Sequence, residues 1–384
     1  MKELLSKLER DIKNTIKEEE IKFTYIIGNN GTGKSILLSK LASRLAHEKE
    51  INKIQCVTNT IYDKFFQLKS EKIIYLGLRN VSNAIFFSTI TRQILKNLIS
   101  NEKCLNMISN QLNQKFEIKF KKSKSSDAIS YIDRRKNRSD KKVFTQSESE
   151  YLNSLLDISI DPHELNSEQR GIITKYLDLN PNNCELAIEK SGKFINYDFL
   201  SSGEQNRLLT AIKILSHLEN NSVIIIDEPE ISLHLHWQQE YHSFLKRIIR
   251  GHNGVHIVIA THSPIIVSEA YKTENSQAIV ILDNDKSASE SFNYLDVVQG
   301  SESFDSIIFD FFNTSTYKSS TVEEKIASIL SRKDLLGNKD QAISELTKMI
   351  GVLNENDEKK NIIYEAINLI KKINLDINNH EVHS

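Results

Sequence analysis

Residues 23–38 read FTYIIGNNGTGKSILL, and this stretch decides the fold. A short apolar run ends at a glycine-rich turn, and a second run with helical spacing follows it. The chain has only 12 glycines, yet three of them lie between Gly28 and Gly33. Because glycine tolerates positive φ, such a turn lets successive backbone N–H groups point inward at an anion. The order of strand, glycine-rich loop and helix therefore predicts a phosphate-binding site.

The loop fits the full P-loop pattern, Gly-x4-Gly-Lys-Ser. Lys34 is expected to neutralise charge on the β- and γ-phosphates, which gives it a catalytic role, and Ser35 is expected to ligate Mg²⁺. The alternative is a glycine-rich turn without a ligand, and the presence of both flanking elements argues against it. The residues expected to bind ATP are Gly28, Asn29, Asn30, Gly31, Thr32, Gly33, Lys34 and Ser35.

Two further apolar runs are followed by polar side chains. Residues 223–226 lead into Asp227 and Glu228, which we expect to hold the metal and to act as general base, respectively. Residues 256–260 precede His262. Both runs are short and wholly apolar, which is typical of central parallel strands covered on two faces. The alternative for Asp227 and Glu228 is a solvated acidic loop, and the alternative for His262 is a purely structural role. Both alternatives are less favoured because the chain also contains a P-loop.

Residues 200–205 read LSSGEQ and lead into a pattern of helical spacing. In isolation, Ser201 would be interpreted as a helix N-cap. Its position between the P-loop and the acids Asp227 and Glu228 favours a functional role instead. We call residues 200–205 the signature motif.

In this order the P-loop, LSSGEQ, IIIDEPE (the Walker B strand) and ATHSP resemble the ATP-binding-cassette (ABC) ATPases, in the branch of chromosome-maintenance (SMC) and repair heads. The resemblance implies an α/β head with a mixed or parallel sheet that converts ATP and water to ADP and phosphate with Mg²⁺. It implies that two copies pack head to tail and that His262 senses the γ-phosphate held by Lys34. The residues implied to contact that phosphate from the other subunit are Ser201, Ser202, Gly203 and Glu204.

The chain departs from this family at three places. Ser202 stands where the signature motif usually has a second glycine, a change that should be tolerated. Leu235 stands after Leu-His, where relatives often have proline. Gln67 is one candidate for the Q-loop glutamine, and its assignment stays open.

The distance between the P-loop and the signature motif predicts an insertion, longer than a transporter cassette needs and far too short for coiled-coil arms. The insertion is therefore expected to be a helical lobe, with helices at 105–118 and about 145–178. The expected segments are the head's N-terminal part with the P-loop (1–100), the inserted helical lobe (101–182), the head's C-terminal part with the signature motif, Walker B and the switch histidine (183–319), and a helical C-terminal appendage (320–384).

Within the lobe, residues 121–142 hold nine Lys or Arg and three Asp. A solvated loop is one interpretation of this basic stretch. The other is a contact with the phosphate backbone of a nucleic acid, independent of sequence and sensitive to salt. Both stay open.

The ATHSP switch, the EPExxLH stretch and residues 75–87 resemble the ATPases of bacterial anti-phage systems. The nearest resemblance is to Septu-type, PtuA-like ATPases, which are also found beside retrons, with the overcoming-lysogenisation (OLD) nucleases as cousins. Those nucleases carry a TOPRIM domain with spaced acidic residues. Residues 283–285 (DND) could mimic one such element, but the chain then becomes helical. We interpret them as a solvated turn and assign no nuclease site to this chain.

The resemblance implies a cytoplasmic homodimer or higher assembly that regulates a separate HNH-type nuclease in anti-phage defence. A retron's reverse transcriptase with its DNA is a further implied partner. The first alternative is a DNA-repair or recombination ATPase acting on DNA ends or gaps. A second is a nucleotide-gated scaffold that barely hydrolyses ATP. A transporter cassette is disfavoured by the long lobe.

Composition restricts the partners and the compartment. Lys and Arg total 50 against 51 Asp and Glu, so no global charge draws the chain to nucleic acid or membrane. The apolar runs are shorter than the roughly 20 residues of a membrane span, and the charged start argues against secretion. Three widely spaced cysteines suggest neither a disulfide framework nor a thiolate metal site. His234 and His236 lack further metal-ligand spacing, so we interpret them as surface or packing residues.

Overall fold

The computed structural model of the chain describes residues 2–28, 31–58, 60, 63–77, 95–96, 98–120, 144–179, 184–231, 233–273, 277–282, 292–297, 321–332, 338–353 and 359–380. Four features of the sequence fall outside these ranges. They are Asn29 with Asn30 of the P-loop, residues 78–87 of the stretch 75–87, the basic stretch 121–142, and the acidic residues 283–285.

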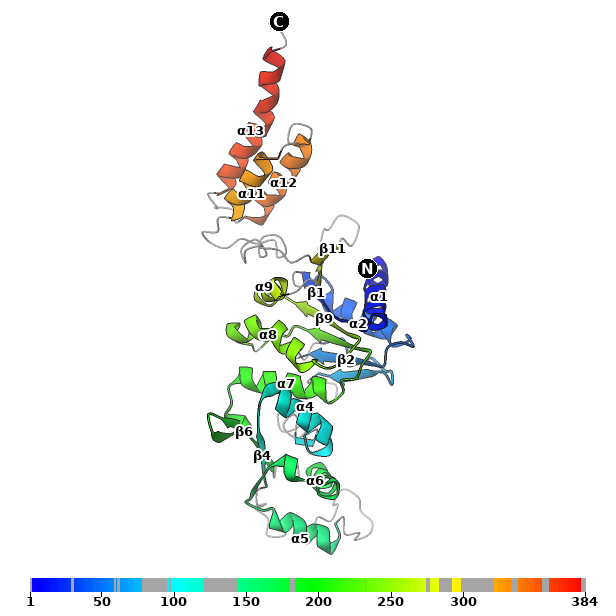
Figure 1. The fold of residues 1–384 in the computed structure, drawn as a ribbon. Helices are drawn as coiled ribbons and strands as arrows, with labels where there is room; N and C mark the ends of the chain where they lie inside the picture. Colours follow the sequence, from blue (N-terminus) through cyan, green and yellow to red (C-terminus); the bar gives the residue numbers. More distant parts are fainter. Residues whose placement is uncertain are drawn as a thin grey trace.

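Within the described residues, a seven-stranded sheet lies at the centre, in the order β11-β10-β1-β9-β8-β2-β3 (Figure 1). Every neighbouring pair is parallel except β10 with β11. The predicted central strands are confirmed, because β8 and β9 pair in parallel and are buried along their whole length. The strands are β1 (Ile21–Gly28), β2 (Lys53–Thr58), β3 (Ile73–Leu76), β8 (Ser222–Asp227), β9 (Val255–Thr261), β10 (Gln277–Leu282) and β11 (Phe292–Val297).

Helices cover both faces of this sheet, which explains why its strands are apolar throughout (Figure 1). In β1, Phe23 and Tyr25 face one core and Ile26 faces the other, as the alternation of side chains along a strand requires. Tyr25 donates or accepts a 2.6 Å hydrogen bond with Nδ1 of His242 in the first core. The first core is covered by α4 (Glu102–Leu112), α7 (Ser202–Leu215), α8 (Leu235–Ile248) and α9 (Pro264–Thr273), and the second by α1 (Lys2–Lys17) and α2 (Lys34–Leu45).

The N-terminal helix α1 is amphipathic, and its apolar residues Leu4, Leu8 and Ile12 are buried. A buried histidine, His256 of β9, joins this helix to the sheet. Its two ring nitrogens lie 2.8 Å from Oγ1 of Thr15 in α1 and 2.9 Å from Oγ1 of Thr24 in β1. Burial lowers the pKa of His256 to about 3, so the ring is neutral and bridges two hydroxyls.

A second sheet of four antiparallel strands, in the order β5-β4-β6-β7, combines two strands of the inserted lobe with two that follow residue 182. The expectation of a helix over 105–118 is wrong beyond residue 112, because α4 ends there and a strand follows. Phe116, Ile118 and Phe120 are buried with a period of two, which suits a pleated strand rather than a helix. The strands are β4 (Phe116–Phe120), β5 (Ser159–Ile160), β6 (Cys184–Lys190) and β7 (Lys193–Asn196).

The predicted helical stretch at about 145–178 is also divided in the structure. It contains two helices separated by β5 and a single 3-10 turn. Because β4 pairs with β6, the small sheet joins strands from both sides of residue 182. The inserted region is therefore mixed α/β rather than purely helical. Its remaining elements are α5 (Gln146–Ser154), η1 (Pro162–Glu164) and α6 (Ser167–Leu179).

Among the described residues after 320, three helices pack around a small apolar core of their own, where a helical appendage was expected. They are α11 (Thr321–Leu330), α12 (Lys339–Val352) and α13 (Lys359–His380). The described part of the chain contains no helix with the length and apolarity needed to cross a bilayer. All three cysteines are buried and carry free thiols.

Candidate functional site

Three strands of the large sheet end side by side and place the predicted site residues together. β1 and β8 both pair in parallel with β9, so the carboxyl ends of all three meet at one edge. Gly28 ends β1, Asp227 ends β8 and Thr261 ends β9. We call this the carboxyl edge; polar ligands commonly bind at such an edge in parallel α/β sheets.

The glycines of the P-loop are required by its close packing and its backbone angles. A Cβ atom on Gly28 would lie 2.7 Å from the backbone oxygen of Leu282 and 2.9 Å from Oγ1 of Thr32. Gly33 has φ 89° and occupies the N-cap position of α2, where a side chain would be strained. The loop therefore delivers the N-terminus of α2 to the carboxyl edge.

Lys34 connects the loop to the switch histidine. Its Nζ donates a 2.9 Å hydrogen bond to the carbonyl oxygen of Gly28 and lies 2.7 Å from Nε2 of His262. Burial lowers the pKa of Lys34, while the nearby acids Glu228, Asp227 and Glu230 oppose that shift. Burial, and then Lys34, lower the pKa of His262. His262 is therefore neutral here and accepts from the ammonium at Nε2.

Asp227 is a buried carboxylate with unmet bonding capacity. Within the described residues, neither of its oxygens makes a hydrogen bond of ordinary geometry. Burial raises its pKa to about 6, although the Ser35 hydroxyl and Lys34 are close enough to oppose the shift. A buried carboxylate beside a hydroxyl is the oxygen-donor set that Mg²⁺ takes, with phosphate oxygens completing its shell. Asp227 and Ser35 therefore fit the expected metal.

Glu228 follows Asp227 in an unusual backbone conformation. Its φ is 51°, in the left-handed region that residues other than glycine seldom adopt. Its N–H donates to the carbonyl oxygen of Ala260 at 2.9 Å, which holds this turn against β9. The side chain is 28% exposed, and Oε1 lies 3.5 Å from Nε2 of His262. The turn thus places a partly exposed carboxylate, suited to a general base, beside His262.

Glu230 is a site residue that the motif search did not assign. Its Oε1 accepts the backbone N–H of His262 at 2.5 Å, and its Oε2 accepts the hydroxyl of Thr261 at 2.8 Å. Burial raises the pKa of Glu230, and these two bonds oppose that shift. It fixes the backbone at the end of β9 and so positions His262. The sequence signal was the third acid of Asp-Glu-Pro-Glu, two residues after Glu228.

The signature motif caps α7. Ser201 is the N-cap residue and forms a reciprocal capping box with Glu204. Gly203 is buried, and a Cβ there would lie 2.9 Å from Cδ1 of Trp237. Ser202 opens the helix and is exposed. Among the described residues, the side-chain bonds of Ser201 and Glu204 are made with each other and with Lys190, and none is made with the P-loop.

Three further residues were singled out by sequence, and one of them, His234, lies beside the signature motif, with its Cδ2 3.5 Å from where a Cβ on Gly203 would be. Gln67 lies in the described connection between β2 and β3. His234 is the N-cap residue of α8 and makes no capping bond through its side chain. Nε2 of His236 lies 3.4 Å from Oε1 of Glu240, one turn further along the same helix.

Comparisons with known proteins find similarities in the central part of the chain. Residues 91–268 match the model of a family described as "AAA domain, putative AbiEii toxin, Type IV TA system". Over 132 residues the chain is 29% identical to protein ea59 of Escherichia phage lambda. That match covers 32% of this chain and 25% of ea59, so the chain spans about a quarter of the length of that relative.

Two solved structures are similar at low TM-scores. One is an inward-facing metal-chelate type ABC transporter, with TM-score 0.33, 15% identity, and coverage of 77% of this chain and 82% of that chain. The other is the SMC head domain from Thermotoga maritima, with TM-score 0.33, 13% identity, and coverage of 72% and 90%. The family match includes the signature motif, the acids after β8 and His262. Residues 91–268, somewhat less than half of the chain, are thus similar to an AAA domain family.

Proposed function

We propose that the chain binds ATP with Mg²⁺ and hydrolyses it at the carboxyl edge. The observation that carries this proposal is the convergence of three groups at the carboxyl edge: Lys34, the ring of His262 that accepts from it, and Glu228 beside that ring. Nε2 of His262 lies 2.7 Å from Nζ of Lys34 and 3.5 Å from Oε1 of Glu228. A cation for phosphate, a polar ring and a carboxylate base thus meet where the P-loop opens α2.

Each group has a distinct task in this proposal. The loop amides and Lys34 bind the β- and γ-phosphates. Asp227 and Ser35 hold Mg²⁺, which when bound would neutralise phosphate charge. Glu228 accepts the proton of the attacking water, and His262 contacts the γ-phosphate. Glu230 keeps His262 in place through the backbone N–H of that residue.

We further propose that the site is completed by a second copy of the chain, packed head to tail. The signature motif makes no side-chain bond to the P-loop within the described residues, and its N-cap Ser201 is exposed. An exposed helix N-terminus is suited to an anionic group. Phe199, just before the motif, is 82% exposed, as expected of a side chain that a partner covers.

The test of the ATPase proposal is phosphate release by the purified chain, compared with Lys34→Ala. We expect Mg²⁺-dependent hydrolysis that Lys34→Ala abolishes, and ATP-dependent association measured by light scattering. Hydrolysis by Lys34→Ala at the wild-type rate would contradict the site. A wild-type chain that binds ATP but turns it over no faster than Lys34→Ala would support a nucleotide-gated scaffold instead.

The biological role that we propose is regulation of an effector nuclease in anti-phage defence, within the cytoplasm. Three points support it: the motif resemblance to Septu-type ATPases, the toxin named in the description of the matched family, and the similarity to a phage protein. The proposed partners are a separate HNH-type nuclease and a retron's reverse transcriptase with its DNA. The inserted region and the C-terminal helices are the proposed docking surfaces, with 121–142 contacting a nucleic-acid backbone.

The partners are tested by purifying the Glu228→Gln protein with ATP from its native host. Mass spectrometry and sequencing then identify the protein and the nucleic acid that accompany it. We expect a small nuclease, with or without a reverse transcriptase and its DNA. Recovery of the homodimer with duplex DNA alone would overturn the defence role and favour a repair or recombination ATPase.

A further inference from the structure

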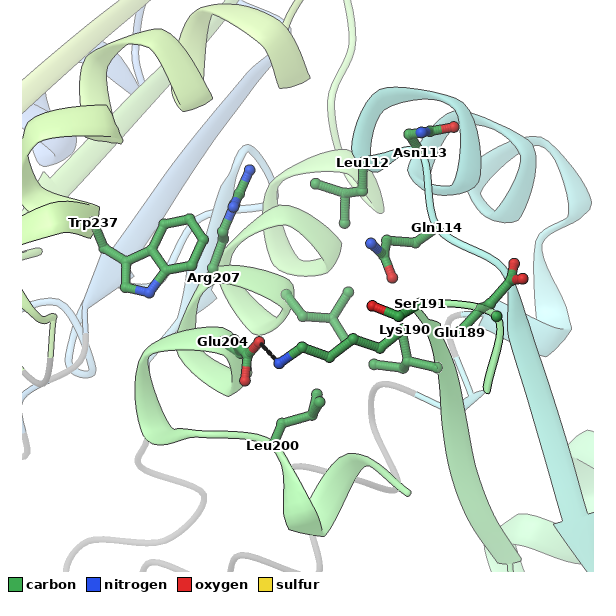
Figure 2. A pocket seen from close by; sticks show the side chains of 13 residues that line it. Leu112, Asn113, Gln114, Glu189, Lys190, Ser191, Leu200, Glu204, Arg207 and Trp237 are labelled. Atoms are coloured by element: carbon green, nitrogen blue, oxygen red, sulfur yellow. Dashed lines mark hydrogen bonds and ion pairs between the residues drawn. The ribbon is translucent and has the colours of Figure 1, made fainter. Parts of the chain in front are cut away.

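A pocket of about 490 Å³ lies beside the signature motif, between α7, the β6–β7 hairpin and the end of α4. Figure 2 shows Lys190 extending from the hairpin toward Glu204 on α7, so that an ion pair crosses the pocket. Arg207 lies on the other side, with its guanidinium carbon 4.3 Å from the centre of the Trp237 ring. One wall of the pocket is therefore formed by the signature motif, and Lys190 of the four-stranded sheet faces that wall.

A continuous set of hydrogen bonds runs from Lys190 to Ser201. Nζ of Lys190 donates to Oε1 of Glu204 at 2.6 Å. The other oxygen, Oε2, accepts the backbone N–H of Ser201 at 3.0 Å and its hydroxyl at 2.9 Å. The backbone N–H of Glu204 donates back to Oγ of Ser201 at 3.4 Å. The two oxygens of the Glu204 carboxylate therefore have different partners: Oε1 accepts from Lys190, and Oε2 accepts from Ser201.

We propose that Lys190 is a positioning residue for the signature motif. It holds Glu204, and through Glu204 it holds Ser201, in the geometry that receives the phosphate bound by the partner subunit. This inference rests on the proposed head-to-tail site and adds a residue to it. Lys190 itself touches neither nucleotide nor water at the reacting centre in this arrangement.

The charge of Glu204 explains why a lysine is needed. A carboxylate in the first turn of α7 lies where the proposed site brings a polyanionic phosphate, and two like charges repel each other. Lys190 offsets this negative charge through its ion pair with Glu204. The hydrogen bond from Lys190 is the main cause that lowers the pKa of Glu204, so the pair stays ionised at neutral pH.

The hairpin gives Lys190 a defined position. Lys190 pairs with Lys193 across a two-residue turn. The turn residues Ser191 and Gly192 both have positive φ, at 53° and 77°, as in the type I′ turns that fit the twist of a hairpin. The backbone of Lys190 is therefore fixed at the end of a regular β-strand.

The ion pair is too exposed to act mainly on folding. The side chain of Lys190 is 54% exposed and that of Glu204 is 27% exposed. Exposed pairs of this kind stabilise folded proteins little, because water screens them. Loss of Lys190 should therefore be seen in the behaviour of the signature motif more than in the unfolding temperature.

The experiment compares Lys190→Met, Lys190→Arg and the control Lys115→Met. Lys115 is a matched control because its Nζ pairs with Oε2 of Glu189, the residue just before Lys190 in β6, at 3.3 Å. We expect Lys190→Met to weaken ATP-driven association and to slow hydrolysis about two- to fivefold, the range of an exposed charge pair. Lys190→Arg should restore both, and Lys115→Met should match the wild type.

Two further readouts separate positioning from a general structural defect. ATP affinity at protein concentrations too low for association should be unchanged in Lys190→Met. The acid limb of its pH profile should move to higher pH, because the pKa of Glu204 rises without the lysine. Equal values for Lys190→Met and Lys115→Met, or a parallel loss of monomer ATP affinity, would overturn the inference.

Amide hydrogen exchange at Ser201 distinguishes failure of this inference from failure of the proposed function. Faster exchange in Lys190→Met, without any ATP-driven association of the wild-type chain, would show that the bonds exist while the head-to-tail site fails. Unchanged exchange together with normal ATP-driven association would refute the positioning role alone.

Discussion

The ammonium of Lys34 lies 2.7 Å from Nε2 of His262, and this contact joins the P-loop to the end of β9. An ammonium can only donate, so the histidine nitrogen offers its lone pair and the ring is neutral. Burial of both groups lowers both pKa values. A bound γ-phosphate would compete for the same lysine, so nucleotide binding and the position of His262 are linked.

The general base is tested with Glu228→Gln. The amide keeps the shape of the side chain but cannot accept a proton from water, so hydrolysis should fall by roughly 10²–10⁴-fold. ATP binding and ATP-driven association should persist, because the loop and Lys34 are unchanged. Phosphate release and equilibrium binding measure the two effects. Glu150→Gln, on the exposed side of α5, is the control; near-normal turnover in Glu228→Gln would exclude Glu228 as the base.

The buried carboxylate of Asp227 predicts a pH-dependent stability in the absence of Mg²⁺ and nucleotide. Its folded pKa, about 6, lies above the ordinary value of 3.8. Between these two values the folded chain binds more protons at this site than the unfolded chain, so its contribution to stability falls as pH rises from about 4 to 6. Above that window the cost is on the order of 3 kcal/mol.

Asp227→Asn removes this titration without changing the volume of the side chain. We expect the variant to be more stable than the wild type at pH 7 and to lose that advantage near pH 4. Urea unfolding at both pH values checks the sign. Binding of Mg²⁺-ATP should weaken in the same variant, because the amide has lost the carboxylate charge. A variant less stable than wild type at pH 7 would contradict the assigned cost of burial.

The role of Glu230 is tested with Glu230→Gln. In the wild type, one carboxylate oxygen of Glu230 accepts the His262 N–H and the other accepts the Thr261 hydroxyl. In the variant, the uncharged amide oxygen can accept only in place of one of them, and the amide nitrogen cannot accept at all. Loss of one bond to a charged acceptor costs about 1.5–3 kcal/mol, so hydrolysis should fall roughly tenfold or more. Thr261→Val, which removes one of the two bonds, should cause a smaller loss. Equal effects of the two variants would argue against the positioning role.

The packing of the signature motif on α8 is tested with Gly203→Ala. The new Cβ would lie 2.9 Å from Cδ1 of Trp237, so α7 or the indole must shift. We expect a loss of about 1–3 kcal/mol in unfolding free energy, together with weaker ATP-driven association.

A second glycine provides the control for this substitution. Gly171 lies in α6, and a Cβ there meets nothing within 4 Å. Gly171→Ala should therefore stabilise the chain by about 0.5–1 kcal/mol, since alanine loses less entropy in a helix. Urea denaturation measures both variants. A stabilising Gly203→Ala would mean that the contact with Trp237 relaxes without cost.

Local sequence patterns were sufficient for much of this molecule. The helix α1, the step from β1 through the P-loop to α2, and the central strands β8 and β9 follow from apolar spacing and glycine placement over short stretches. The acids after β8 and the histidine after β9 could be assigned to one edge, because parallel strands bring their carboxyl ends together.

Tertiary structure decided the features that depend on distant partners. β4 forms a strand because it pairs with β6, which lies some seventy residues later in the sequence. Phe116, Ile118 and Phe120, every second residue of β4, are buried, and this burial stabilises the strand only when β6 is paired with it. Glu230 and Lys190 belong to the site only through bonds to His262 and Glu204. Backbone propensity acts between neighbours in the sequence, whereas these roles arise from long-range packing, which no local pattern encodes.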